Sequence, residues 1–516
     1  MQNDMKVRPR LRFSPSPTGC LHLGGVRTAL YNYLYAKKNG GDFILRIEDT
    51  DSTRFVPGAE QYIIDTFKWL GLDFDEGPHI GGKYGPYRQS DRKDIYIKYV
   101  NQLLDSGKAY YAFDTKDEID ALRNKECNFS YDIKTRKTLK NSLTLSKDEV
   151  DTLLSNNTPY VVRIMYPDVP VIITVNDTIC GKVTVKSDTL DDKVLWKSED
   201  QLPTYHLANI VDDHLMEITQ VIRGGEWLPS APMHVFLYSC FGWDAPVFTH
   251  LPLILKPAGM GNGKLSKRDG DIGGFSVFPL PWVDPTDPSK STIGFKGEGY
   301  TPAGMINMLA FLGWNPGTTK EVYTLDELIN DFSLDKVGKT GAKYNPTKAR
   351  WFNNQHLKLT DTSLLVDDFK NDLISRNIVL DDKTIYTIVN ENKNKVDFIK
   401  DLFNEVNFFF ERPTVFDAKV LKKWKDTTND TLLKLASNFT SLTDWNSVSI
   451  QKVFENFVND SKLGFSDVAP FLRLVLTGKG SGQSMFDIMQ IIGKDETLER
   501  IYNFKTSFPA AIFPTA

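Results

Sequence analysis

Several common features are scarce or missing in this chain of 516 residues. Its four cysteines (Cys20, Cys127, Cys180 and Cys240) form no CxxC pair, which argues against a disulfide framework and gives no obvious zinc site. No apolar run has the length of a membrane span, and the first ten residues, MQNDMKVRPR, lack the apolar core of a signal peptide. These absences predict a soluble cytoplasmic protein without a membrane partner.

The net charge rules out few classes of protein. The net charge of -4 is mildly acidic, and a large enzyme with such a balance still binds nucleic acid through a local basic face. With 41% apolar and 25% charged residues the composition is that of a globular protein. The length predicts three or four domains.

Glycine and proline are distributed unevenly along the chain. Residues 351–460 contain no glycine and one proline, Pro413, and amphipathic segments such as VDFIKDLFNEVNFFF predict an all-helical C-terminal domain. The phenylalanines at 408–410 are expected to lie mostly in its core. By contrast, residues 256–300 hold nine glycines and five prolines around the sequence KLSKR, at 264–268. A flexible segment of that length is usually functional.

One histidine lies in an unusual loop. Residues 14–25 read SPSPTGCLHLGG and contain His22. The strand-like residues 11–13 come before this loop, and a predicted helix at 26–38 and a predicted strand at 43–47 come after it. This order predicts a βαβ unit with His22 at the ligand-binding edge of a parallel sheet.

Further α/β elements are expected from residue 205 onward. The sequence predicts a strand at 216–224 and a helix at 234–242. Residues 76–200 are mixed, with a helix at about 91–106 and two β-rich runs, YVVRIMY and VPVIITV. The pattern indicates a region inserted between two halves of one sheet.

The histidine loop suits a phosphate, although it matches neither familiar phosphate motif. A Walker A loop that began at Gly19 would need lysine at position 25 and serine or threonine at position 26, where Gly25 and Val26 stand. The other motif, GxGxxG, is absent. Taken alone, His22 is better explained as a helix cap or a solvent-facing residue, and KLSKR as a solvated basic run. Together they place a histidine donor and mobile lysines where a polyphosphate would lie against a helix start.

The pair of motifs resembles that of class I aminoacyl-tRNA synthetases, in which SPTGxLHxGG corresponds to HIGH and KLSKR to KMSKS. The chain is most similar to the bacterial-type glutamyl-tRNA synthetases. Long stretches carry this resemblance, among them FILRIEDTD, GPYRQSDRKDIYIKY, PTYHLANIVDDHLMEITQVIRGGEW, MLAFLGWNP and VGKTGAKYNPTKARWFNNQ.

The resemblance implies a fold and a domain order. The expected fold class is α/β: a class I synthetase Rossmann-like catalytic domain with an inserted mixed α/β domain, followed by an all-helical anticodon-binding domain. The implied domains are a catalytic domain in two halves (1–80 and 200–255), an inserted acceptor-stem-binding domain (81–199), the KLSKR loop with a stem-contact region (256–340) and the helical anticodon-binding domain (341–516).

The resemblance also implies site residues. Arginine suits the carboxylates of glutamate because its planar fork pairs with them, whereas Glu48 would meet the ammonium. The expected glutamate-binding residues are Arg12, Ser14, Ser16, Glu48, Tyr205, Asn209 and Arg223. The expected ATP-binding residues are Ser16, His22, Gly24, Gly25, Lys264 and Lys267, of which His22, Lys264 and Lys267 are the catalytic ones. The candidate tRNA contacts are Arg54 and Arg473.

The implied activity is that of a glutamate–tRNA ligase. ATP and Mg²⁺ would activate L-glutamate to glutamyl-adenylate, and tRNA(Glu), required already for activation, would accept the glutamyl group. A monomer is expected. Some members bind zinc through a CxC, but here Ala112 and Asp114 take those places, so no structural zinc is expected. The segment between KLSKR and GYTPAGM is longer than usual for the family, and its Pro- and aromatic-rich stretch FSVFPLPWVDPTDPSKS receives no assigned role.

Four other functions stay open at this point. A glutaminyl-tRNA synthetase shares the catalytic fold, but it usually carries a β-rich anticodon region. A truncated paralogue that glutamylates a tRNA base lacks the domain predicted at 341–516. A small nucleotidyltransferase needs neither KLSKR nor that domain. A non-enzymatic tRNA-binding protein would be expected to lose His22 or Lys267, and both are present.

Overall fold

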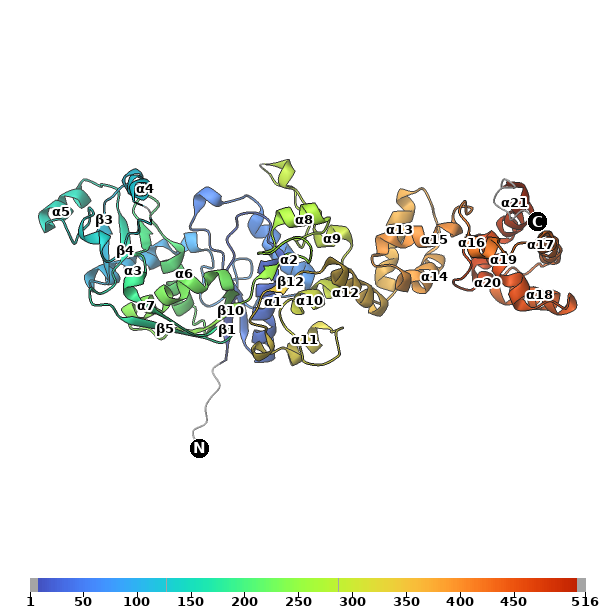
Figure 1. Cartoon of the computed structure of the whole chain (residues 1–516), viewed down its shortest axis with the longest axis horizontal. Coiled ribbons are helices and arrows are strands. Elements are labelled where there is room, and N and C mark those ends of the chain that lie inside the picture. The colour runs from blue at the N-terminus through green and yellow to red at the C-terminus, as the bar shows by residue number, and fades with distance from the viewer. Residues whose placement is uncertain (1–7, 127, 286, 508–516) are drawn as a thin grey trace, which may run out of the picture. The chain divides into compact units, whose positions relative to one another are not determined.

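The structure is a computed structural model that describes residues 8–126, 128–285 and 287–507. The chain divides into two compact units, Met1–His356 and Leu357–Ala516, and most of their helices and several of their strands are labelled in Figure 1. Among the described residues, no helix is both long enough and apolar enough to span a membrane.

The first βαβ unit positions the histidine loop. The strand β1 (Arg10–Phe13) pairs in parallel with β2 (Asp42–Leu45), and α1 (Leu23–Lys38) connects them. The sequence predicted the helix from residue 26, and this start was wrong by three residues. His22 is the N-cap of α1, so Gly24 and Gly25 lie in its first turn.

A second group of strands continues the parallel arrangement. The strand β9 (Gln220–Gly224) pairs in parallel with β10 (Val247–Leu251), and α7 (Ala231–Phe241) lies between them in the chain. Thr219 donates its backbone N–H to the carbonyl of Arg10 at 3.1 Å, which brings β9 beside β1. The loops after β1 and β9 therefore open at the same edge.

The predicted inserted region contributes to two sheets. Its hairpin of β5 (Ile172–Asp177) and β6 (Gly181–Lys186) joins β10, which gives the order β6-β5-β10-β9. A separate antiparallel sheet has the order β3-β4-β7-β8. Its strands and the two helices beside them in the chain are β3 (Ala109–Ala112), α4 (Lys116–Lys125), α5 (Lys147–Ser155), β4 (Val161–Ile164), β7 (Val194–Lys197) and β8 (Leu202–Pro203).

Helices pack against these strands to form one large apolar core. The helices are α3 (Lys93–Asp105), α6 (Tyr205–Leu215) and α7. Leu207 of α6, Val221 of β9 and Leu237 of α7 have no exposed surface and belong to the same cluster. Burial of this apolar area holds rigid the strand ends from which the site is built.

The Gly- and Pro-rich segment folds back on the first βαβ unit. Tyr62, on α2 (Ala59–Leu70), donates its hydroxyl to the carbonyl of Leu280 at 2.9 Å, and Trp282 packs edge-on against the same tyrosine. Leu23 donates its backbone N–H to the carbonyl of Val277 at 2.8 Å. The segment therefore packs beside the start of α1.

Short elements complete the first unit. They are β11 (Ile254–Leu255), α8 (Lys267–Gly273), α9 (Gly294–Glu298), α10 (Pro302–Ala310), α11 (Leu325–Asp331), β12 (Ala342–Lys343) and α12 (Pro346–Leu359), whose last residues belong to the second unit. The strand β11, which comes shortly before the KLSKR loop in the chain, pairs in parallel with β12.

The described part of the second unit contains helices and no strand. One apolar cluster joins α13 (Ser363–Ser375), α14 (Asp382–Asn392) and α15 (Leu402–Val406). A second cluster joins α16 (Ala418–Leu421), α17 (Asp426–Thr440), α18 (Ser447–Asp460), α19 (Phe465–Thr477), α20 (Met485–Ile492) and α21 (Lys494–Ser507). Phe408 and Phe409 are buried as predicted.

Candidate active site

His22 combines a structural bond with a free donor. Its Nδ1 accepts the backbone N–H of Gly24 at 3.1 Å, so the proton of a neutral ring must be on Nε2. That Nε2 is buried and has no hydrogen-bond partner in the described chain. Burial and the nearby Lys264 lower the pKa of His22 to about 4, so the ring is neutral at pH 7. It therefore offers one N–H to a ligand oxygen.

The KLSKR loop brings two lysines to the same region. Lys264 Nζ lies 2.8 Å from Oε1 of Glu226, and the side chains of both are exposed. Lys267 donates from Nζ to the carbonyl of Lys290 at 2.9 Å. Each ammonium has an exposed hydrogen bond that it exchanges for a phosphate at little cost.

A cavity of about 240 Å³ joins these two motifs. It is lined by His22, Gly24, Gly25 and Lys264, together with Glu226. The first turn of α1 presents its N–H groups and positive dipole end at this place. Lys267 does not line the cavity, but its ammonium lies 6.0 Å from the ring centroid of Phe278, and that ring packs edge-on against His22.

A second cavity, of about 320 Å³, contains the predicted amino-acid-binding residues. It is lined by Arg12, Ser14, Ser16, Glu48, Tyr205, Asn209 and Arg223, and it shares Gly24 and Gly25 with the first cavity. Residues from β1, the β2 end, α6 and β9 thus meet at one sheet edge, although they are up to about 210 positions apart. Ser14 Oγ is buried there without a hydrogen-bond partner in the described chain.

The floor of this cavity is a buried network of charges. Arg12 donates from Nε and one terminal nitrogen to the two oxygens of Asp213, at 2.9 and 3.2 Å. Arg46 donates to Asp213 at 2.8 Å and to Glu48 at 3.3 Å. Asn209 donates to Glu48 at 3.1 Å, and burial raises the pKa of Glu48. A ligand ammonium at Glu48 would restore the counter-charge that favours its ionised form.

Arg223 has a different environment from Arg12. Its guanidinium is buried, and its hydrogen bonds go to His250, His234, the Tyr205 hydroxyl and the carbonyl of Trp227. None of these acceptors is a carboxylate. The arginine therefore presents a positive charge without a directly bound counter-ion, as a carboxylate site requires.

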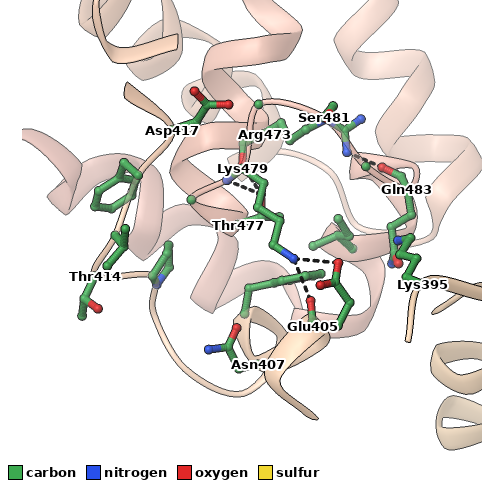
Figure 2. Close-up of a pocket in the computed structure, with 18 residues that line it drawn as sticks. Lys395, Glu405, Asn407, Thr414, Asp417, Arg473, Thr477, Lys479, Ser481 and Gln483 are labelled. Carbon is green, nitrogen blue, oxygen red and sulfur yellow. Dashed lines mark hydrogen bonds and ion pairs between the residues drawn. The ribbon is translucent and has the colours of Figure 1, made fainter. Parts of the chain in front are cut away.

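The two candidate tRNA contacts lie in separate places. Arg54 is exposed, is held by Asp51 at 2.6 Å and lines the amino-acid cavity. Arg473, on α19, lines a cavity of about 780 Å³ within the second unit, where it donates to the carbonyl of Gln483 (Figure 2).

This cavity of the second unit is walled by a glycine-rich turn, residues 478–483. Gly478 ends α19 at a φ of +74°, and a Cβ there would lie 2.3 Å from the carbonyl oxygen of Val415, so glycine is required. Lys479 donates to Glu405 at 2.8 Å across the cavity (Figure 2). Neither polar atom of the Gln483 amide, both of which are buried, has a hydrogen-bond partner in the described chain. Such groups suit the edge of an unstacked base.

Sequence reasoning missed the residues that position the predicted ones. Asp213, His234 and His250 hold the two arginines, and Glu226 holds Lys264. No motif spacing identifies them, because each belongs to a different element. The burial of charged residues on apolar helices, as in ANIVDDHL for Asp213, was the one available signal.

Fold and site together are those of a class I tRNA synthetase. More narrowly, the chain belongs to the E and Q group of this class, because residues 7–351 match the family model described as tRNA synthetases class I (E and Q), catalytic domain. Residues 364–505 match the model described as anticodon binding domain. The resemblance inferred from the motifs and the predicted fold class are confirmed.

Similar proteins cover nearly the whole chain. A glutamate–tRNA ligase of Phocaeicola vulgatus is 53% identical over 496 residues, which are 95% of this chain and 97% of that protein. A glutamate–tRNA ligase of Bacteroides fragilis is 51% identical, with the same coverage. A solved structure of a glutamate tRNA ligase from Elizabethkingia meningosepticum, in complex with its amino acid, has a TM-score of 0.90 and 48% identity, and the match covers 97% of this chain and all of that one.

Proposed function

We propose that this chain is a glutamate–tRNA ligase, which activates L-glutamate with ATP and transfers it to the 3′ end of tRNA(Glu), with AMP and diphosphate as products. The observation that carries this proposal is the cavity with Glu48 at one wall and Arg223, bound to uncharged groups only, at another. The pair complements an ammonium and a side-chain carboxylate. The names of the similar proteins support the same substrate.

In the first step, an oxygen of the glutamate α-carboxylate attacks the α-phosphorus of ATP. A new P–O bond forms as the bond to the bridging oxygen breaks, and diphosphate leaves with that electron pair. His22 Nε2–H, Lys264 and the N–H groups at Gly24 and Gly25 would meet the charge that develops on the phosphate oxygens. Lys267 would join them after leaving the carbonyl of Lys290. Both cavities are lined by Gly24 and Gly25, which supports neighbouring sites for the two substrates.

Magnesium remains a prediction from the resemblance, as does the lack of a structural zinc. In the described ranges, no group of three or more His, Cys, Asp or Glu side chains is placed to hold a metal ion. Mg²⁺ bound with ATP would take most of its ligands from the phosphates and water, which is its usual mode with nucleotides. It would supply charge neutralisation, and the chain's own residues would orient the substrate.

In the second step, a ribose hydroxyl of the terminal adenosine attacks the carbonyl carbon of glutamyl-adenylate. An ester forms and AMP leaves. Arg54, which lines the amino-acid cavity, would contact the tRNA end. We infer that residues 81–199 bind the acceptor stem, that residues 256–340 contact the stem and that Arg473 contacts the anticodon loop. The two compact units divide between His356 and Leu357, and an anticodon-binding domain that begins at residue 341 stays a prediction from the resemblance.

The direct test is aminoacylation with radiolabelled glutamate, ATP and a tRNA(Glu) transcript. The proposal predicts acid-precipitable label that base treatment releases, because the product is an ester. Periodate-oxidised tRNA, which lacks the terminal diol, is the matched control and should accept nothing. Label from glutamine in place of glutamate would overturn the assignment.

The expected cytoplasmic monomer belongs to the same proposal. Light scattering of the purified chain, alone and with tRNA(Glu), tests the monomeric state. A mass of one chain, and of one chain with one tRNA, is expected. A mass of two chains in the absence of tRNA would contradict it.

A further inference from the structure

Three of the seven histidines form one chain of hydrogen bonds behind the amino-acid cavity. His250 Nε2 accepts from Arg223 Nε at 2.9 Å, and its Nδ1 lies 2.7 Å from Oδ2 of Asp177. His234 Nδ1 lies 3.2 Å from a terminal nitrogen of Arg223, and its Nε2 lies 3.1 Å from Nδ1 of His206. The activation step described above uses none of these histidines directly.

The Asp177 carboxylate, which accepts, and the Arg223 guanidinium, which donates, fix the ring nitrogen that carries the proton in His250 and His234. Asp177 accepts backbone N–H bonds from residues 179, 180 and 250, which stabilise its carboxylate. His250 therefore donates from Nδ1 and keeps the lone pair on Nε2 for the arginine. Since a guanidinium only donates, His234 must likewise keep its Nδ1 lone pair and donate from Nε2 to His206. One arrangement of protons satisfies all the bonds, and in it every ring is neutral.

Burial supports this arrangement. His234 and His250 are almost completely buried. Burial, followed by the charge of Arg223, holds the pKa of His234 well below its ordinary value, and burial lowers the pKa of His250. Both rings thus remain uncharged acceptors at neutral pH.

Arg12, unlike Arg223, is paired directly with a carboxylate. The fork of Arg12 is occupied by the two oxygens of Asp213. With such a partner, an arginine gains little from a second carboxylate. Along the hydrogen bonds that start at Arg223, the first carboxylate is that of Asp177, and the whole His250 ring separates it from the guanidinium. The imidazoles therefore fix the guanidinium in place and leave its charge for the ligand.

We propose that His234 and His250 are specificity-determining positioning residues, which hold Arg223 through uncharged acceptors so that the cavity requires a carboxylate side chain and rejects its amide. This rests on the proposed function, because the cavity must be the glutamate site. Glutamine would bring no counter-charge to the buried guanidinium, and a site that loses a charged partner discriminates strongly.

A matched pair of variants tests the idea. His234→Asn and His234→Asp both place an oxygen where Nδ1 was, and both lose the bond to His206. The two side chains have nearly the same shape and differ in charge, with an amide NH₂ in one where the other has a second carboxylate oxygen. In tRNA-dependent ATP–pyrophosphate exchange, the KM for glutamate should be roughly 10- to 100-fold higher in H234D than in H234N. The reason is that the new carboxylate would pair with Arg223 and weaken the charge-assisted bond from Arg223 to the glutamate side chain. The KM for glutamine and the kcat for glutamate should change far less.

The outcomes separate the two proposals. A glutamate-to-glutamine preference in H234D within threefold of that in H234N overturns the inference and leaves the proposed function standing. A wild-type chain that does not prefer glutamate overturns the proposed function, and the inference with it. Should H234D fail to fold, ¹⁵N-histidine spectra of the unaltered chain at pH 7 decide. Neutral rings at His234 and His250, protonated on Nε2 and Nδ1 respectively, support the inference, and a doubly protonated ring at either position overturns it.

Discussion

Replacing His22 with asparagine should separate the structural bond of this residue from its proposed catalytic one. Asparagine places Oδ1 close to the position of Nδ1, so it keeps the bond to the Gly24 N–H that caps α1. It has no group at the position of Nε2, the buried donor without a partner. Alanine removes both groups. Comparison of the two variants therefore assigns each loss to one nitrogen.

The structure sets the expected magnitudes. Loss of one donor to a developing oxyanion costs about 100- to 1,000-fold in kcat, and both variants should show it. Loss of the cap costs about 1 kcal/mol in free energy of unfolding, and the difference between the variants should approach that value, with H22A the less stable. Because the donor acts mainly in the transition state, kcat and kcat/KM for ATP should fall together.

Two assays suffice for this prediction. ATP–pyrophosphate exchange with glutamate and tRNA gives kcat and KM, and urea unfolding gives the stability of each variant. An H22N chain that keeps more than a third of the wild-type kcat would refute the role of Nε2. A loss of stability in H22N equal to that in H22A would refute the assignment of the cap to Nδ1.

Three further predictions follow from the same contacts. Lys264→Ala and Lys267→Ala should each lower kcat about 100-fold in pyrophosphate exchange, with changes below about 0.5 kcal/mol in urea unfolding because their bonds are exposed; unchanged kcat in both would contradict this. Arg473→Ala should raise the KM for tRNA about 10-fold in aminoacylation and leave that for ATP unaltered, since the loss is one charge-assisted bond in the second unit; an equal rise for ATP would contradict it. Burial lowers the pKa values of His22 and His206 to about 4, so unfolding takes up protons below pH 6.5, and stability should fall from pH 6.5 to 4 by about 1.4 kcal/mol per pH unit for each. Urea titrations in which neither H22N nor H206N flattens this slope would contradict that attribution.

Local patterns predicted the parts of the fold that depend on local physics. The helical spacing after residue 26 and the strand-like residues before the loop gave the first βαβ unit, within three residues at the helix start. The helix begins earlier because a histidine can cap it through Nδ1, and two glycines in a first turn look like a loop in the sequence. The glycine-free stretch likewise gave the helical second unit.

Long-range pairing was not readable in the same way. The hairpin of β5 and β6 joins β10 although about 70 residues separate Asp177 from Phe248, which pair in the folded chain. The β-rich run was recognised, but which sheet it entered was not, because strand propensity carries no information about partners.

Some site residues could likewise be predicted from the sequence, and others could not. Family motifs led to Arg12 and Arg223, which do line one cavity. The difference between them, a carboxylate at one and imidazoles at the other, depends on Asp213 and the histidines of α7 and β10. Those residues are fixed by packing of the core, so no spacing along the chain indicates their role.

The account depends most on glutamate being the amino acid that this site activates. ATP–pyrophosphate exchange with glutamate or glutamine, each with and without tRNA(Glu), tests that claim directly. We predict exchange that requires both glutamate and tRNA, with a kcat/KM for glutamine far below that for glutamate. Exchange with glutamine in place of glutamate, or no exchange under any of the four conditions, would contradict it.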